Sequence, residues 1–195
     1  MRLITDIRKT WPRRLVEPAA RLVVKTGLSP NMLTVLGFLL NLGVAAVLAT
    51  GHLLVGGFLV LFSGAFDLLD GAVARLTQRS TQFGAFLDST LDRLSDAALL
   101  FGFLILYVRE QSTLEVLLIF VALVGSMLVS YTRARAEGLG FECEVGLLGR
   151  GERVVLLALG LLFNRVLIVL WILAIFTNLT AAQRLLYVWQ KTKGK

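Results

Sequence analysis

The chain has 195 residues, of which 56% are hydrophobic, and a formal net charge of +7. The long apolar runs exclude an ordinary soluble protein, because roughly 20 apolar helical residues can cross a bilayer. The basic charge does not indicate nucleic-acid binding, since lysines and arginines flank the apolar runs instead of forming one soluble face. The length fits one domain, residues 1–195. We predict an all-α, polytopic membrane protein.

Residues 1–27 alternate apolar and basic side chains. Leu3, Ile4 and Ile7 recur at helical spacing opposite basic residues, and the stretch from Leu15 to Val24 repeats this pattern. Such segments lie in the headgroup region of anionic membranes. We therefore expect an N-terminal amphipathic interfacial helix, or two; a solvated basic arm is the alternative.

Six apolar segments follow, at about 30–50, 53–76, 83–108, 113–137, 150–163 and 166–190. Ser29-Pro30 offers an N-cap and a first-turn proline, which start the first segment. Gly51-His52 and Asn164-Arg165 read as turns, and 138–149 is a Gly-rich connector. We expect a bundle of six transmembrane helices over about 30–190. All lysines and arginines except Arg109 and Arg165 then lie on the side of the termini, which predicts a multi-pass protein of the cell membrane with its termini in the cytoplasm.

Four carboxylates interrupt the second and third apolar segments. Asp67 and Asp70 are three residues apart and Asp88 and Asp92 four apart, so each pair shares one helix face. In antiparallel helices with a rise of 1.5 Å per residue, Asp67 is level with Asp92 and Asp70 with Asp88. Small residues should let the two backbones approach closely; these are Gly71, Ala74, Gly84 and Ala85.

Charged groups at this depth are costly and need a partner. Divalent cations prefer such oxygen ligands, and Mg²⁺ keeps positions free for phosphate and water. Two ions a short distance apart would clamp a diphosphate during in-line displacement. The alternative is structural pairing of the aspartates with Arg75, Arg79 and Arg93. We expect Asp96, one turn after Asp92, to be a structural partner of an arginine or a helix end.

A second constellation is basic. Arginines from three predicted helices would meet near the same side of the membrane and hold one anion; they are Arg133, Arg135, Arg150, Arg153 and Arg184. The alternative is that they only orient the helices in the bilayer.

The pattern D-x2-D-G-x2-A-R-x8-G-x3-D-x3-D, spelt from Asp67 to Asp92, resembles the signature of the CDP-alcohol phosphotransferases. The length and the six-segment layout are also similar to this family. The resemblance implies transfer of a substituted phosphate from a CDP-linked lipid to an alcohol, with release of CMP. It further implies a homodimer in a lipid bilayer. The positive-inside rule places the aspartates, and with them the active site, on the cytoplasmic side together with the termini.

The resemblance also assigns roles. Asp67, Asp70, Asp88 and Asp92 would hold two Mg²⁺ ions, with Mn²⁺ as a substitute, and Asp92 would be the general base. The CDP-lipid would be bound by Asn31, Met32, Leu33, Thr34, Gly71, Arg75 and Thr81.

The strings around Arg133, Arg153 and Arg184 resemble the phosphatidylinositol phosphate synthase branch of the family, which implies inositol phosphate as acceptor and CDP-diacylglycerol as donor. These three arginines would hold the acceptor phosphate. At the first position the branch often has lysine. Other acceptors (glycerol 3-phosphate, inositol or serine) and CDP-archaeol as donor remain alternatives. An ion transporter is a distant alternative, because its sites usually lie at the bilayer midplane.

Overall fold

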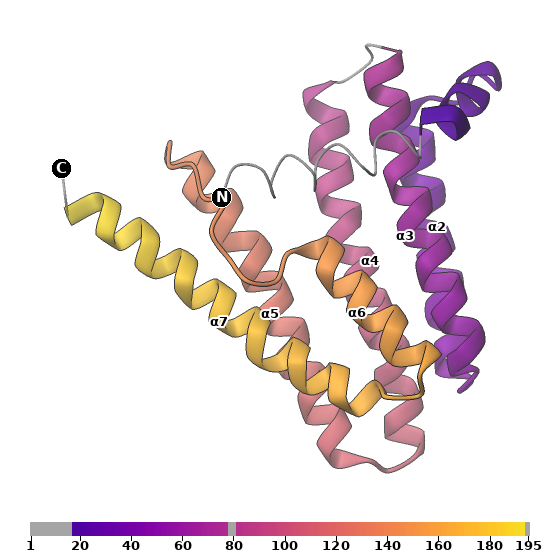
Figure 1. Cartoon of the computed structure of the whole chain (residues 1–195), viewed down its shortest axis with the longest axis vertical. Coiled ribbons are helices and arrows are strands. Elements are labelled where there is room, and N and C mark those ends of the chain that lie inside the picture. The colour runs from indigo at the N-terminus through magenta and orange to yellow at the C-terminus, as the bar shows by residue number, and fades with distance from the viewer. Residues whose placement is uncertain (1–16, 78–80, 194–195) are drawn as a thin grey trace.

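The computed structural model describes residues 17–77 and 81–193. In this part of the chain the structure is helical without strands, and its helices are α2 (Pro30–Ala49), α3 (Leu53–Leu76), α4 (Gln82–Arg109), α5 (Thr113–Gly138), α6 (Arg150–Leu162) and α7 (Val166–Lys193). A short helical segment, residues 17–25, precedes α2. Each of the six predicted apolar segments is helical, and each predicted boundary lies close to the observed one (Figure 1).

The helix ends form where the sequence predicts them. The Ser29 side chain caps α2 by accepting a hydrogen bond from the Met32 amide at 3.2 Å, which satisfies one of the free amides of the first turn. Gly51, with φ of +82°, makes the turn between α2 and α3. Asn164 has φ of +52° at the turn between α6 and α7, a conformation that asparagine tolerates better than most residues.

α2 lies between the two helices that carry the aspartates. It packs against both α3 and α4, whereas α3 and α4 share no close backbone contact within the described residues. The expectation that small residues bring α3 and α4 together is therefore wrong. The glycines of α4 face α2 instead: a Cβ at Gly84 would lie 2.8 Å from Asn31 Oδ1, and one at Gly102 would meet the Ala45 carbonyl. The acidic residues of α3 and α4 therefore lie near one another without direct packing of the two helix backbones.

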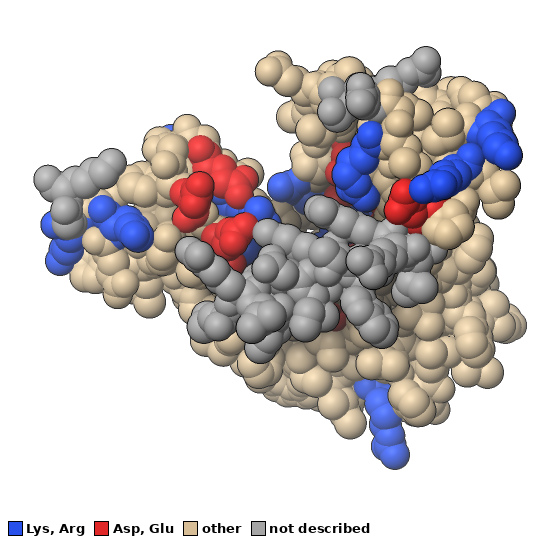
Figure 2. All heavy atoms as spheres, turned by 45° about the horizontal axis from the view of Figure 1, so that its top comes forward, with Lys and Arg blue, Asp and Glu red and all other residues tan. Residues whose placement is uncertain are grey.

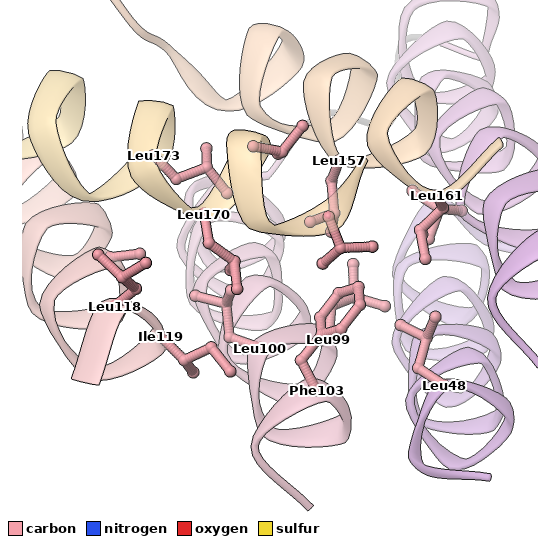
Figure 3. Close-up of a cluster of buried hydrophobic side chains, with 14 of the residues drawn as sticks. Leu48, Leu99, Leu100, Phe103, Leu118, Ile119, Leu157, Leu161, Leu170 and Leu173 are labelled. Atoms are coloured by element: carbon pink, nitrogen blue, oxygen red, sulfur yellow. The ribbon is translucent and has the colours of Figure 1, made fainter. Parts of the chain in front are cut away.

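The remaining helices close the bundle on the other side. α6 packs against α3, while α7 packs against α5 and α6 and crosses α5 obliquely (Figure 1). The main apolar core joins residues such as Leu48, Leu99, Phe103, Leu161 and Leu170 (Figure 3). On α2 and α4 these residues lie in the half of each helix that is farther from the α3–α4 connection. The apolar core is therefore at the end of the bundle opposite the aspartates.

The outer surface suits a lipid environment. α2, α3, α5 and α7 are long and apolar enough to cross a membrane. Large apolar side chains such as Phe58, Phe62 and Phe120 point outward, each about 60% exposed. α4 falls outside this group because it carries several charges, and α6 has 13 residues. At 1.5 Å per residue α6 is about 20 Å long, against roughly 30 Å of hydrocarbon. The described helices are those of a multi-pass membrane protein.

The segment 17–25 is tied to the bundle. Ala20 is fully buried against Leu33, Ala72 and Val73, which belong to α2 and α3. Leu22 is 65% exposed on the other side of the segment. The rest of the predicted amphipathic stretch, residues 1–16, lies outside the described residues.

Candidate active site

The charged residues gather at the end of the bundle where α3 leads into α4. Figure 2 shows acidic and basic side chains close together on this end, while the neighbouring surface is mostly uncharged. The aspartates come from the last part of α3 and the first half of α4. The arginines come from the end of α5, the start of α6 and the second half of α7. Five helices therefore contribute charged side chains to one region.

Arg150 joins the two acidic helices. Its Nη2 donates to Asp67 Oδ2 at 2.5 Å, and its Nη1 lies 2.8 Å from Asp92 Oδ1. One guanidinium contacts both carboxylates, so Asp67 and Asp92 lie at the same level, as the helical rise predicts. Asp67 also passes close to α2, where a Cβ at Gly37 would lie 2.9 Å from its Oδ1. Glycine at position 37 leaves room for this carboxylate.

Asp70 and Asp88, the other matched pair, line a cavity of about 240 Å³. Asp70 is buried and accepts hydrogen bonds from the Thr34 hydroxyl at 3.0 Å and the Gly71 amide at 2.5 Å. Five of the residues predicted to bind the CDP-lipid line this cavity: Asn31, Thr34, Gly71, Arg75 and Thr81. We call it the aspartate cavity.

Two of the predicted lipid-binding residues lie elsewhere. Met32 is 53% exposed on the surface of α2, and Leu33 is buried in the small core with Ala72. Neither lines the aspartate cavity. Successive residues of a helix point in different directions, so the run 31–34 cannot face one cavity throughout. Asn31 and Thr34, three residues apart, share the face that does.

A second cavity of about 310 Å³ lies beside the first and shares Asp88 with it. Asp92 and Asp96 form its acidic wall. Its basic wall has four of the five arginines of the predicted constellation: Arg133, Arg150, Arg153 and Arg184. We call it the arginine cavity. Arg135 is exposed and does not line it.

The three arginines predicted to hold a phosphate are anchored in different ways. Arg184 is buried and donates to the carbonyls of Val145, at 2.9 Å, and Val129. Arg153 is buried and donates from Nη2 to Asp96 at 2.5 Å. Arg133, about half exposed, pairs with Glu137 at 2.7 Å one turn along α5. The structure thus brings three separately anchored guanidinium groups to one cavity.

Pairing of the aspartates with arginine does occur, and among the described residues the partners are not Arg75 or Arg93. Arg79, the third predicted partner, lies outside the described residues. Arg93 donates to the Ser89 carbonyl of its own helix instead of an aspartate. Arg150 and Arg153 of α6 take the carboxylates, including Asp96, which is an arginine partner as expected. The partners in these ion pairs are more than fifty residues apart in sequence. The spacing of residues within one helix therefore cannot predict them.

The donor set suits a hard divalent cation, because carboxylate oxygens from two facing helices are the ligands that Mg²⁺ and Mn²⁺ prefer. As they stand, the described residues include no group of three or more His, Cys, Asp or Glu arranged to hold a metal ion. The Arg150 guanidinium lies against one oxygen of Asp67 and one of Asp92, so a positive charge of the chain already contacts both carboxylates.

Comparison with known proteins agrees with this layout. A sequence model of the CDP-alcohol phosphatidyltransferase family matches residues 27–189. The chain is 40% identical over 190 residues to the archaetidylinositol phosphate synthase of Methanothermobacter thermautotrophicus, covering 93% of this chain and 92% of that protein.

Two crystal structures of the phosphatidylinositol phosphate synthase of Mycobacterium tuberculosis are similar throughout, both at 34% identity. The structure with CDP-DAG bound has a TM-score of 0.84 and covers 90% of this chain and 94% of that one. The complex with manganese and citrate has a TM-score of 0.83 and covers 89% and 88%. The resemblance seen in the motif is confirmed, and nothing supports an ion transporter. The chain belongs to the CDP-alcohol phosphatidyltransferase family.

Proposed function

We propose that this protein transfers a phosphatidyl group from a CDP-linked lipid to inositol phosphate, giving phosphatidylinositol phosphate and CMP. The observation that supports this most is the junction of the two cavities at Asp88. A donor diphosphate in the aspartate cavity would lie next to an acceptor phosphate in the arginine cavity. Both relatives described above are named as synthases of inositol phosphate lipids.

The donor occupies the aspartate cavity in this proposal. Arg75 offers a charge-assisted hydrogen-bond fork to the diphosphate, and Gly71 lets the nucleotide approach the helix closely. Asn31, Thr34 and Thr81 contact the cytidine or the diphosphate from α2 and the start of α4. We take CDP-diacylglycerol as the donor, as bound in the mycobacterial structure; CDP-archaeol is the alternative suggested by the archaeal relative.

Asp67, Asp70, Asp88 and Asp92 would hold two Mg²⁺ ions, with Mn²⁺ as a substitute. When bound, the ions neutralise the diphosphate and stabilise the charge that develops during displacement. The manganese complex of the mycobacterial relative supports divalent metal use.

Asp92 acts as the general base in this scheme. An acceptor hydroxyl attacks the phosphorus that carries the diacylglycerol, and Asp92 takes the hydroxyl proton. The new P–O bond forms as the P–O bond to CMP breaks, so CMP leaves with the bridging oxygen. Arg133, Arg153 and Arg184 hold the acceptor phosphate through charge-assisted hydrogen bonds and so orient the hydroxyl. Asp92 lines the arginine cavity, within reach of a hydroxyl bound there.

The membrane arrangement follows from the same reading. We propose that all six helices cross or enter the bilayer, with the termini and both cavities on the cytoplasmic side. The charged half of α4 and the start of α6 would then lie at the membrane surface, where water reaches the aspartates. A homodimer belongs to this proposal on the strength of the family resemblance.

The test is a reconstituted assay with purified full-length protein and Mg²⁺. CDP-diacylglycerol or CDP-archaeol is offered with inositol phosphate, glycerol 3-phosphate, inositol or serine. CMP release and the lipid product are measured by mass spectrometry. Phosphatidylinositol phosphate should form in a metal-dependent manner. Turnover with inositol but not inositol phosphate would overturn the acceptor assignment, and no CMP release with any pair would overturn the function.

A further inference from the structure

Arg153 forms an ion pair through one of its three guanidinium nitrogens, and the other two have no partner among the described residues. Its side chain is 7% exposed, and Nη2 donates to Asp96 Oδ2 at 2.5 Å. Nε and Nη1 of Arg153 are buried and have no hydrogen-bond partner among the described residues. Buried donors without a partner are rare in native structures and point to a ligand. Since Arg153 lines the arginine cavity, these two donors are suited to an anionic oxygen bound there.

Asp96 connects this arginine to the rest of the site. Its Oδ2 accepts from Arg153, and its Oδ1 lies 3.6 Å from Nε of Arg150. Arg150 in turn contacts Asp67 and Asp92. The Asp96 side chain is 13% exposed, so solvent screens these interactions little. Asp96 therefore lies between Arg150, which contacts Asp67 and Asp92, and Arg153, which is proposed to bind the acceptor.

The other two arginines do not depend on such a partner. Arg184 is held by backbone carbonyls, which no side-chain substitution removes. Arg133 is paired with an exposed glutamate on its own helix. Of these three arginines, Arg153 is the one that pairs with a largely buried carboxylate from another helix. Without that carboxylate, Arg153 would be drawn toward the remaining acidic wall at Asp92 and Asp88.

We propose that Asp96 is a positioning residue for acceptor binding, in addition to the residues that the family motif identifies. It fixes Arg153 so that Nε and Nη1 face the acceptor phosphate, and it keeps Arg153 away from the catalytic carboxylates. The proposal rests on the proposed function, because it assumes a phosphorylated acceptor in the arginine cavity.

The experiment compares Asp96→Asn with wild type in the reconstituted assay. The KM for inositol phosphate should rise about tenfold, equivalent to about 1.4 kcal/mol, while kcat and the KM for CDP-diacylglycerol stay within about twofold. Glu110→Gln, an exposed acid-to-amide change just after the far end of α4, is the matched control and should leave all three parameters unchanged. Asp96→Glu keeps the charge and should return the KM to within about threefold of wild type.

A double-mutant cycle shows whether Asp96 acts through Arg153. In an Arg153→Gln background, Asp96→Asn should add little further increase in KM, because the group that it positions is already gone. Full additivity would overturn the proposal, as would an unchanged KM or a loss confined to kcat. If Asp96→Asn unfolds, Asp96→Glu and the Arg153→Gln background still give the comparison.

Failure of the proposed function is separately visible in the wild-type protein. Turnover with glycerol 3-phosphate in place of inositol phosphate would overturn the named product but leave the role of Asp96, since the same split in KM is then measured with that acceptor. Turnover only with an acceptor that lacks phosphate would overturn both.

Discussion

The guanidinium of Arg150 donates to Asp67 at 2.5 Å, joining the first residue of α6 to α3 across 83 positions of sequence. The same group lies 2.8 Å from Asp92 on α4, so one side chain offsets negative charge on both helices. Four carboxylates in an apolar setting repel one another unless positive charge lies among them. Arg150 supplies such charge from within the chain, at the position where a family enzyme is expected to bind metal.

Arg150 and a divalent ion should therefore compete for Asp67 and Asp92. We predict that Arg150→Gln binds Mn²⁺ roughly tenfold more tightly than wild type, a gain of about 1.4 kcal/mol. The same variant should unfold at a lower temperature in the presence of a chelator, because the carboxylates lose their internal counter-charge. Calorimetric titration with Mn²⁺ and thermal unfolding with and without metal measure the two effects.

Arg150→Lys is the control, since it keeps the charge and should bind Mn²⁺ with nearly wild-type affinity. Equal or weaker Mn²⁺ binding by Arg150→Gln would show that the guanidinium and the ion do not share these oxygens.

The helices and the acidic pairs could be predicted from sequence because both depend on local spacing. Apolar segments, the Ser29 cap and the turns at Gly51 and Asn164 need only neighbouring residues. The matched depths of Asp67 and Asp92 followed from helical rise in two antiparallel segments, and their shared contact with Arg150 agrees with that arithmetic.

What the sequence did not reveal is which helices touch. The small residues near the aspartates favoured direct packing of α3 on α4, but small residues show only that some helix comes close. In the structure the close neighbour is α2, as the position of Asn31 beside Gly84 shows. For the same reason the sequence places Arg150 among the five arginines of the basic constellation but gives no sign of its contacts with Asp67 and Asp92. Partners that are distant in sequence depend on this packing order.

Gly84 gives a test of the close contact between α4 and α2. A Cβ there would lie 2.8 Å from Asn31 Oδ1 and 3.0 Å from Thr81 Oγ1, so both side chains must shift. We predict that Gly84→Ala raises the KM for the CDP-lipid about fivefold, equivalent to about 1 kcal/mol, with a smaller effect on acceptor KM. Both constants come from the CMP-release assay.

Gly43→Ala is the matched control, because Gly43 is also inside a helix and a Cβ there meets nothing within 4 Å. It should leave the KM for the CDP-lipid unchanged. An equal rise in this KM in the two variants would mean that the effect comes from replacing any helical glycine and not from the aspartate cavity.

The acceptor arginines should differ in their tolerance of lysine. Arg153 is buried, with one nitrogen on Asp96 and two that have no hydrogen-bond partner among the described residues. Lysine cannot reproduce that geometry, so Arg153→Lys should raise the KM for inositol phosphate about tenfold or more. Arg133 is half exposed and pairs with Glu137 on its own helix, so Arg133→Lys should stay within about threefold. Steady-state kinetics with varied acceptor measures both, and a reversed order would contradict the anchoring described here.

In the proposed mechanism Asp92 is the residue on which the chemistry depends most directly. It borders the arginine cavity, the proposed acceptor site, and shares the contact with Arg150 with Asp67 on the facing helix. Asp92→Asn keeps an oxygen ligand but cannot take the acceptor proton, so kcat should fall by about 10²- to 10⁴-fold. Mn²⁺ binding and the KM for CDP-diacylglycerol should change much less. Metal titration and CMP release from the same preparation separate these effects, and turnover near the wild-type rate would remove Asp92 from the base role.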